Sequence, residues 1–244
     1  MLKARPECFI FGDIYSIGMN GQKKVRMAGW LLRMIGIALA VYAGVEIYHY
    51  RADLSRHEEA LRSLKELQVE MTYVRQGIEK TVHAHIKVKE ASVDLLKLLE
   101  RGPSEEQLAE VDRLDVMARR TYRLTYAEDL INGLIQNVKV LDMKDDSLIY
   151  LLTSWPGLID IYKEKEVIAE NFYLAEFLPY LIHHTNMTTE PSTKEKMSLY
   201  SDQVYRNLIK EKMELVIHVL YDGQVVKNYT DDVLGRLDEE LKAR

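Results

Sequence analysis

Two histidine pairs are the residues with the clearest potential for metal or proton chemistry. His83 and His85 are two positions apart, and His183 and His184 are adjacent. Side chains on a helix share a face at separations of three or four, so neither spacing aims two imidazoles at one ion. We expect His83 and His85 to be solvated surface side chains. His183 and His184 lie at a helix end. A metal-binding or pH-sensing role is the less favoured interpretation of this pair.

Sequence motifs for catalysis and nucleotide binding are absent. The sequence has no G-x-x-x-x-G-K-[ST], G-x-G-x-x-G, G-x-S-x-G or H-E-x-x-H. A di-iron bundle needs Glu-x-x-His on two helices, and the one such motif runs from Glu46 to His49. Acidic clusters such as Glu164, Glu166 and Glu170 are expected on solvated helix faces. We therefore predict no catalytic, cofactor-binding or metal-binding residue, and a protein that is not an enzyme.

Composition excludes several other classes of protein. The net charge of -5 argues against a nucleic-acid-binding protein, which would concentrate basic residues on one face. The single cysteine, Cys8, excludes an intramolecular disulfide framework and a multi-cysteine zinc site. With only 12 glycines and 5 prolines among 244 residues, the chain favours long helices over a turn-rich β-fold.

Tyrosine is unusually frequent, with 15 residues. Several tyrosines lie within helical patterns that also carry aliphatic stripes, so we expect them at the edge of the core with the hydroxyl group in water. A small-ligand pocket lined by some of them is the alternative. The tyrosines concerned are Tyr122, Tyr126, Tyr150, Tyr162, Tyr173 and Tyr180.

An apolar segment at residues 27–48 predicts a transmembrane helix. Its length of about 22 residues gives roughly 33 Å of helix, enough to cross the hydrocarbon core of a bilayer. Trp30 and Tyr48 are aromatic residues of the kind found at membrane interfaces. Arg33 and Glu46 lie toward opposite ends, where their charged groups can reach the headgroups. These four residues are the predicted membrane anchor.

Two other interpretations of this segment remain open. Only about 12 residues separate Arg33 from Glu46, a length that also fits a signal-peptide core or a buried helix of a soluble protein. A signal peptide would be cleaved near residues 41–43, and initiation at Met19 rather than Met1 would shorten its basic region.

The orientation of the span follows weakly from its basic flanks. Basic residues precede the span and also follow it, so their count is nearly balanced. We expect the N-terminus in the cytoplasm and the C-terminal domain on the outer, periplasmic side of a cell (inner) membrane, crossed once. The basic residues are Lys23, Lys24 and Arg26 before the span, and Arg51, Arg56 and Arg62 after it.

The fold class that we predict is all-α. A basic leader (1–26) precedes the transmembrane helix (27–48), which continues into a stalk helix (49–101) and an antiparallel helical bundle (102–244). Apolar residues of the stalk recur at spacings of three and four, which predicts one buried stripe. The stripe consists of Leu61, Leu64, Leu67, Met71, Val74, Ile78, Val82 and Ile86.

Further helices are expected in the bundle. Arg101-Gly102-Pro103 should end the stalk, and helices should begin at Glu105, at Thr125 and near Asp145. Gly133 suggests close helix packing, and Pro156 should kink or split its helix. We expect a break at Asp222–Gly223 in the C-terminal region. The expected buried stripe of the helix after Pro156 is Ile161, Ile168, Phe172, Ala175 and Leu178.

Three segments together resemble bacterial single-span membrane proteins known only as domains of unknown function. These are a charged helix after the span (LKELQVEM), the helix start TYAEDLINGL, and DSLIYLLTSWPGLIDIYKEKE leading to FLPYL. The resemblance implies a basic N-terminus, one span and a helical domain, and it implies no activity. Pro156 departs from the uninterrupted helices of that layout.

Two functions are compatible with this organisation. The first is a membrane-anchored interaction or scaffold protein whose stalk and bundle contact a second copy or another membrane protein. The second is an extracytoplasmic bundle that senses a small ligand and signals through a partner. A sensor normally has an output domain or a second span, and neither is visible in the sequence. The interaction protein is therefore the leading prediction, with the bilayer as its other partner and no nucleic acid.

Overall fold

A computed structural model describes residues 21–140, 145–185 and 191–244. All of the regular structure in these ranges is helical, which confirms the predicted all-α class. The chain divides into two compact units, Met1–His57 and Glu58–Arg244. Helix α1 (Gly21–Arg101) supplies residues to both units.

The first unit contains the apolar segment. Between Gly29 and His57 the chain is helical, and an 18-residue window has a mean hydropathy of 1.6 with none of its residues buried. Trp30, Arg33, Glu46 and Tyr48, the predicted anchor residues, are all exposed. One helix near the N-terminus is thus long and apolar enough to cross a membrane.

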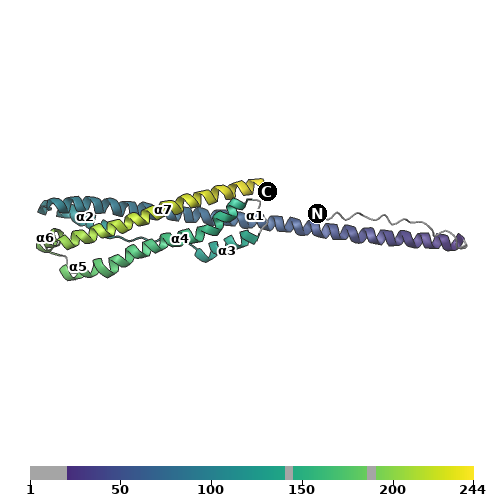
Figure 1. Cartoon of the computed structure of the whole chain (residues 1–244), viewed down its shortest axis with the longest axis horizontal. Helices are drawn as coiled ribbons and strands as arrows, with labels where there is room; N and C mark the ends of the chain where they lie inside the picture. Colours follow the sequence, from purple (N-terminus) through teal and green to yellow (C-terminus); the bar gives the residue numbers. More distant parts are fainter. Residues whose placement is uncertain (1–20, 141–144, 186–190) are drawn as a thin grey trace, which may run out of the picture. The chain divides into compact units, whose positions relative to one another are not determined.

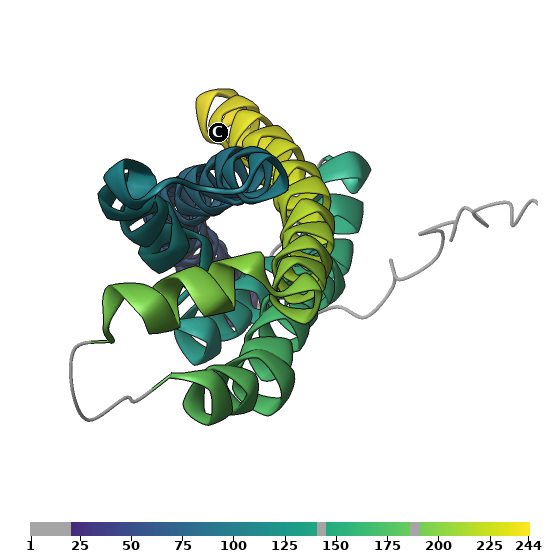
Figure 2. The ribbon, with the colours of Figure 1, turned by 90° about the vertical axis from the view of Figure 1, so that its left-hand side faces the viewer.

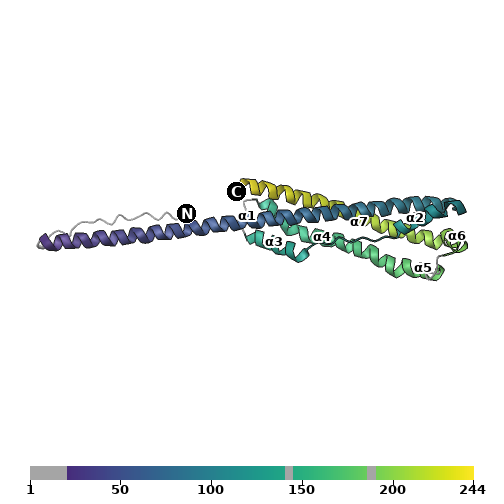
Figure 3. The same ribbon diagram turned by 180° about the vertical axis from the view of Figure 1, so that it is seen from behind.

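The second unit is an antiparallel bundle with four passes. Residues 58–101 of α1 form the first pass, so residues that we expected in a stalk contribute to the core of the bundle. As α1 advances from Arg75 to Val82, its contacts on α7 retreat from Asp231 to Gly223, so these two helices are antiparallel. Figures 1 and 3 show α1, α4 and α7 lying side by side in this unit.

The remaining elements complete the passes, and Figure 2 views them from the end where α2, α5 and α6 lie. The second pass is interrupted by the irregular segment 119–127, whereas the third is nearly continuous. The second pass comprises η1 (Glu105–Gln107, a 3-10 turn), α2 (Leu108–Ala118) and α3 (Glu128–Val140). The third comprises α4 (Asp146–Phe172), the π-helical segment η2 (Tyr173–Phe177) and α5 (Leu178–His184), and the fourth comprises α6 (Thr193–Ser201) and α7 (Gln203–Ala243).

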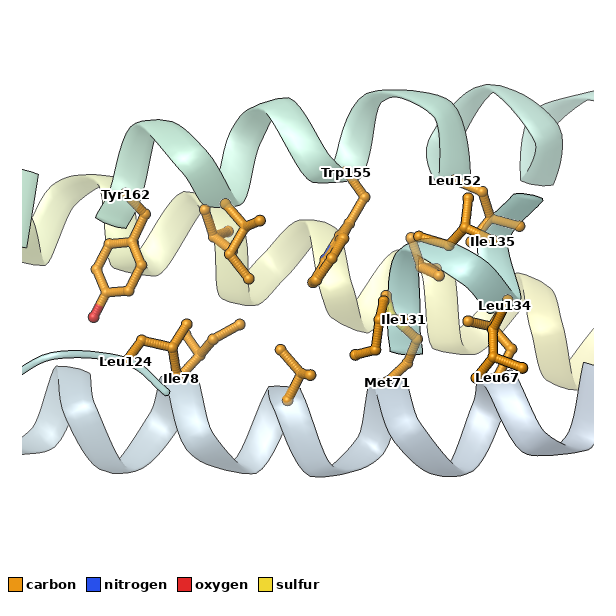
Figure 4. Packing of buried hydrophobic residues seen from close by; sticks show 14 of the residues in the cluster. Leu67, Met71, Ile78, Leu124, Ile131, Leu134, Ile135, Leu152, Trp155 and Tyr162 are labelled. Carbon is orange, nitrogen blue, oxygen red and sulfur yellow. The ribbon is translucent and has the colours of Figure 1, made fainter. Parts of the chain in front are cut away.

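Two apolar clusters fill the bundle. The first joins α1, α3, α4 and α7, and Figure 4 shows Trp155 and Tyr162 of α4 pointing across it toward α1. The second lies around α2, the end of α1 and the start of α7. Within α1, the first cluster includes residues from Leu64 to Val82 and the second includes Ala91, Leu95 and Leu99. Between Val82 and Ala91 on α1, the buried positions are His85 and Val88, which belong to neither cluster.

The predicted break at Asp222–Gly223 is wrong, because α7 runs unbroken from Gln203 to Ala243. Gly223 is buried where α1 and α4 approach α7. A Cβ atom there would lie 2.7 Å from Val82 Cγ2 and 2.9 Å from Tyr162 Cε2. The break lies between α6 and α7 instead, where the carboxylate of Asp202 accepts the backbone N–H of Val204 at 2.8 Å and caps α7. Gly223 permits close packing rather than a turn.

Two predicted buried stripes are also partly wrong. On α1, Ile86 is 36% exposed, and His85 takes the buried position after Val82. In the stripe predicted after Pro156, Ile161, Ile168 and Ala175 are exposed, and Phe172 and Leu178 are only partly buried. The buried face of α4 instead carries Ile159, Tyr162, Glu166 and Ala169. Hydropathy misplaces both faces because polar side chains take interior positions.

Other local predictions have mixed outcomes. Asp145 caps α4, as expected, by accepting the N–H of Ser147 at 2.9 Å. Pro156 lies inside α4 without splitting it. The helix expected from Thr125 begins at Glu128. The prediction of close packing at Gly133 is wrong, since no atom of another described element lies within 4 Å of the position that its Cβ would occupy.

Replacing Gly223 with alanine should destabilise the bundle. Alanine normally favours a helix over glycine by about 1 kcal/mol, but here the added methyl group would collide with Val82 and Tyr162. We expect a net loss of about 1–2 kcal/mol in the free energy of unfolding. The measurement is urea unfolding of the full chain in detergent, followed by circular dichroism.

Gly235→Ala is the matched control on the same helix. Among the described residues, no atom beyond its chain neighbours and its own helix backbone lies within 4 Å of the position of an added Cβ, so this variant should be more stable by about 0.5–1 kcal/mol. Equal effects of the two substitutions would contradict close packing at Gly223.

Candidate functional site

A group of buried polar residues lies at and beside the division between the two apolar clusters. On α1, His85 falls between Val82 of the first cluster and Ala91 of the second. On α7, Lys212 falls between the clusters in the same way, after Ile209 and before Val219. Both side chains are at least 98% buried. Buried ionisable groups of this kind are candidates for a functional site.

We define the polar seam as five residues: His85, Glu166, Asp115, Arg119 and Lys212. They come from α1, α4, α2 and α7, with Arg119 at the C-terminal cap of α2. His85, Glu166, Asp115 and Lys212 are buried, and the side chain of Arg119 is 24% exposed. The seam therefore draws on all four passes of the bundle.

His85 and Glu166 form the part of the seam that joins α1 to α4. His85 Nε2 lies 3.6 Å from Glu166 Oε1, beyond hydrogen-bond distance. The other carboxylate oxygen, Oε2, accepts the backbone N–H of Leu124 at 2.8 Å. Glu166 thereby satisfies the N–H of Leu124, which has no helical hydrogen-bond partner because it lies in the irregular segment 119–127. It ties that segment to α4.

Several polar atoms around His85 have no hydrogen-bond partner among the described residues. They are both ring nitrogens of His85, Oε1 of Glu166 and the hydroxyl of Tyr162. Burial and the nearby charge of Glu166 raise the pKa of the Tyr162 hydroxyl, which keeps it protonated and able to donate. The Tyr122 ring packs edge-on against His85, with 5.8 Å between centroids. Unsatisfied buried polar atoms are costly.

Asp115 is the centre of the second part of the seam. Its carboxylate accepts a hydrogen bond from the Tyr205 hydroxyl and pairs with Arg119 Nη2 at 2.6 Å. Burial raises the pKa of the Asp115 carboxyl, and the charge of Arg119 opposes that effect. Asp112 lies nearby, and its carboxylate accepts hydrogen bonds from Tyr200 Oη at 2.6 Å and from Lys196 Nζ at 2.7 Å. Asp115 and Asp112 are thus each matched by a cation and a phenol.

Lys212 is less well satisfied than Asp115. Its Nζ donates to the backbone carbonyl of Arg120 at 3.0 Å and lies 4.8 Å from the centroid of the Tyr173 ring. Burial lowers the pKa of Lys212 to about 7, and the positive charge of Arg119 acts in the same direction. Tyr173 begins the π-helical segment η2. Such segments replace the regular helical hydrogen-bond pattern and are frequent at functional sites.

A pocket of about 300 Å³ opens beside the seam. Its lining combines charged groups with apolar walls, a composition found in small-molecule sites of the smallest size. The described lining residues that carry charge are Asp112, Asp115, Arg119 and Lys196, and the apolar ones include Val116, Leu181 and Leu199. Its two acids and two bases already pair with one another, so the pocket has little net charge.

The seam was mostly missed by sequence reasoning. The prediction that His83 and His85 are both solvated is wrong for His85, which is 2% exposed, and correct for His83. Glu166 is buried rather than solvated. A helical wheel centred on Val82 and Leu95 could have placed His85 on the buried face, because it lies three residues after Val82. The same spacing places Lys212 on the buried face of α7, three residues after Ile209 and four before Val216.

Other predicted residues lie apart from the seam. His183 and His184 are exposed, and His184 Nδ1 lies 2.8 Å from the carbonyl oxygen of Tyr180. No three His, Cys, Asp or Glu side chains within the described ranges gather into a group that could hold a metal ion. Tyr150 is exposed, whereas Tyr162 is wholly buried rather than at the core edge.

A substitution that removes the Glu166 carboxylate should destabilise the bundle more than one that replaces it with a neutral amide. Glu166→Leu leaves the Leu124 N–H without an acceptor, which we expect to cost about 2–4 kcal/mol in the free energy of unfolding. Glu166→Gln keeps an oxygen for that N–H and should cost about 1 kcal/mol. Urea unfolding of the full chain measures both.

Glu164→Leu, two positions away on an exposed face, is the matched control and should change stability by less than about 0.5 kcal/mol. If Glu166→Leu were as stable as the native protein, the hydrogen bond to Leu124 would not contribute to the free energy of unfolding.

No protein-family model matches this chain, and no curated protein or solved structure is similar to it. Its function must therefore be argued from the apolar helix and the polar seam.

Proposed function

We propose that this chain is a membrane-anchored helical interaction protein. The observation that carries the proposal is the apolar 18-residue window of α1, all of whose side chains are exposed. A helix that buries none of so apolar a segment against its own chain needs another apolar environment. The bilayer supplies that environment, and Trp30, Arg33, Glu46 and Tyr48 are suited to its two interfaces.

The bundle supports the interaction part of the proposal. A groove of about 330 Å³ lies between α1 and α3, where Val69 and Leu130 are each about half exposed. Lys65, Glu66 and Glu70 border it. An apolar floor with a charged rim is characteristic of contact surfaces between proteins. We propose a second copy of the chain as the partner, and another membrane protein is the alternative.

The proposed location is a cell (inner) membrane crossed once, with the bundle on the outer side. Support comes from Lys23, Lys24 and Arg26, which precede the span in sequence. A C-terminal reporter that is active only outside the cytoplasm tests this orientation, and activity of a cytoplasm-specific reporter would reverse it.

Ligand sensing is the second candidate function, and the pocket beside Asp115 and Arg119 favours it. A ligand that binds there would stabilise the folded state in proportion to its concentration. The interaction protein remains the better supported proposal, because the pocket is near the lower size limit for a small-molecule site.

Leu39→Lys should release the protein from membranes. Leu39 lies near the middle of the apolar segment and is 63% exposed. A lysine at the centre of a membrane-spanning helix costs about 3 kcal/mol and is far from either interface. Carbonate extraction followed by sedimentation measures the membrane-bound fraction.

Leu54→Lys is the control, since Leu54 is also exposed and lies beyond the span. It should leave the membrane-bound fraction unchanged. Full retention of the Leu39→Lys variant would show that this segment is not the anchor.

A photo-crosslinking amino acid at Val69 should give a product with twice the mass of the chain. Val69 lines the groove at which we propose the contact, and the same amino acid at exposed Asp129 serves as control. The experiment uses the full chain in native membranes and reads the product by electrophoresis and mass spectrometry. A product of another mass would replace the second copy with a different partner, and the absence of any product specific to Val69 would contradict the proposed interaction.

A further inference from the structure

Lys212 occupies an interior position that its surroundings do not neutralise. The residue is 1% exposed. Within the described part of the chain, no carboxylate lies within ion-pair distance of Nζ, and its one hydrogen bond goes to the neutral carbonyl of Arg120. Lysines at such depth are normally paired. The ammonium form is therefore the costly state of this side chain.

The groups that face Lys212 come from neighbouring elements. From α2, Asp115 attracts the ammonium group and Arg119 repels it. From η2, the Tyr173 ring lies 4.8 Å from Nζ. The buried titratable groups of the seam on α1 and α4 are His85 and Glu166, and neither forms a hydrogen bond or an ion pair with Lys212. The Asp115 carboxylate is already engaged by Arg119 and the Tyr205 hydroxyl.

These surroundings make the charge of Lys212 sensitive to pH near neutrality. Burial lowers its pKa to about 7, with a further contribution from Arg119. An exposed lysine has a pKa of about 10.4. Between these two pKa values, Nζ binds a proton when it reaches water but not when it is packed. Proton uptake in this pH range therefore favours the opened state.

The elements around Lys212 are suited to a local opening. Lys212 lies on α7 between the two apolar clusters, so an opening there can leave the first cluster intact while it separates Tyr205 and Ile209 from Phe177 in the second. On the facing side, the chain passes through the π-helical segment η2, whose hydrogen bonds differ from those of α4 and α5. Opposite it, Arg120 belongs to the irregular segment 119–127. Elements with irregular hydrogen bonding open more readily than regular helices.

We propose that Lys212 is a proton-operated switch in the bundle: uptake of a proton by its amine separates α7 from η2 and the end of α2, and loss of the proton closes the contact. Water supplies and accepts the proton. The sign follows from the two states. The ratio of packed to open molecules is highest above about pH 10. It falls about tenfold for each unit that the pH falls from 10 to about 7, and it changes little below pH 7.

Hydrogen–deuterium exchange of the full chain in detergent tests the switch between pH 6 and 9. After correction for intrinsic exchange rates, amides of Tyr173–Phe177 and of the first turns of α7 should exchange about tenfold faster for each unit that pH falls from 9 to 7. The rates should level off below about pH 6.5. Amides of the first apolar cluster, around Trp155, should show no such slope.

Lys212→Met removes the titrating amine and keeps the side-chain length, so it should abolish the slope and keep the contact closed. Lys212→Arg holds a permanent charge and should give fast exchange at every pH, which tests the proposal even if the Met variant fails to fold. Lys210→Met, at an exposed position two residues away, should retain the native slope. A flat native profile, or a native slope in Lys212→Met, would overturn the proposal.

Discussion

The close contact of α1, α4 and α7 at Gly223 sets the arrangement of the bundle. With only a hydrogen atom on that residue, Val82 and Tyr162 can both approach the backbone of α7. This contact fixes which side of α1 faces inward near Val82, and His85, one helical turn further, follows onto the same buried face. On α4, Glu166 follows Tyr162 inward in the same way. The position of the buried His85–Glu166 pair is therefore a consequence of helix packing.

The sequence alone predicts the fold class and much of the first cluster. From Leu64 to Val82, spacings of three and four identify side chains that are indeed buried. The prediction fails at Ile86 and Ile168, because hydropathy assigns apolar residues to the core while the packed helices turn His85 and Glu166 inward. The reading of Asp222–Gly223 as a break fails for a related reason. Local propensity carries no information about the close approach that requires glycine there.

The candidate site was harder to predict than the fold because its members are far apart in sequence. Asp115 and Tyr205 are 90 residues apart, and Leu124 and Glu166 are 42 apart. The local sequence around each of these residues does not indicate these contacts. Their roles change only when α2, α4 and α7 exclude water around them, since burial is what makes an unpaired charge costly. Lys212 illustrates this best: it lies three residues after Ile209 and four before Val216 on the buried stripe of α7, yet its residue type alone predicts exposure.

The polar seam has an energetic cost that its position makes useful. Replacing buried charged groups with apolar side chains of similar size is often neutral or stabilising, so a purely structural bundle would gain by joining its two apolar clusters. His85 and Lys212 lie between the clusters on α1 and α7, and the part of the bundle around α2, α5 and α6 belongs to a different cluster from the one that packs α1 against α4 and α7. In the proposed membrane-anchored protein, the first cluster would maintain the bundle while the contact at Lys212 responds to protons. A uniform apolar core would couple the two regions and suppress that response.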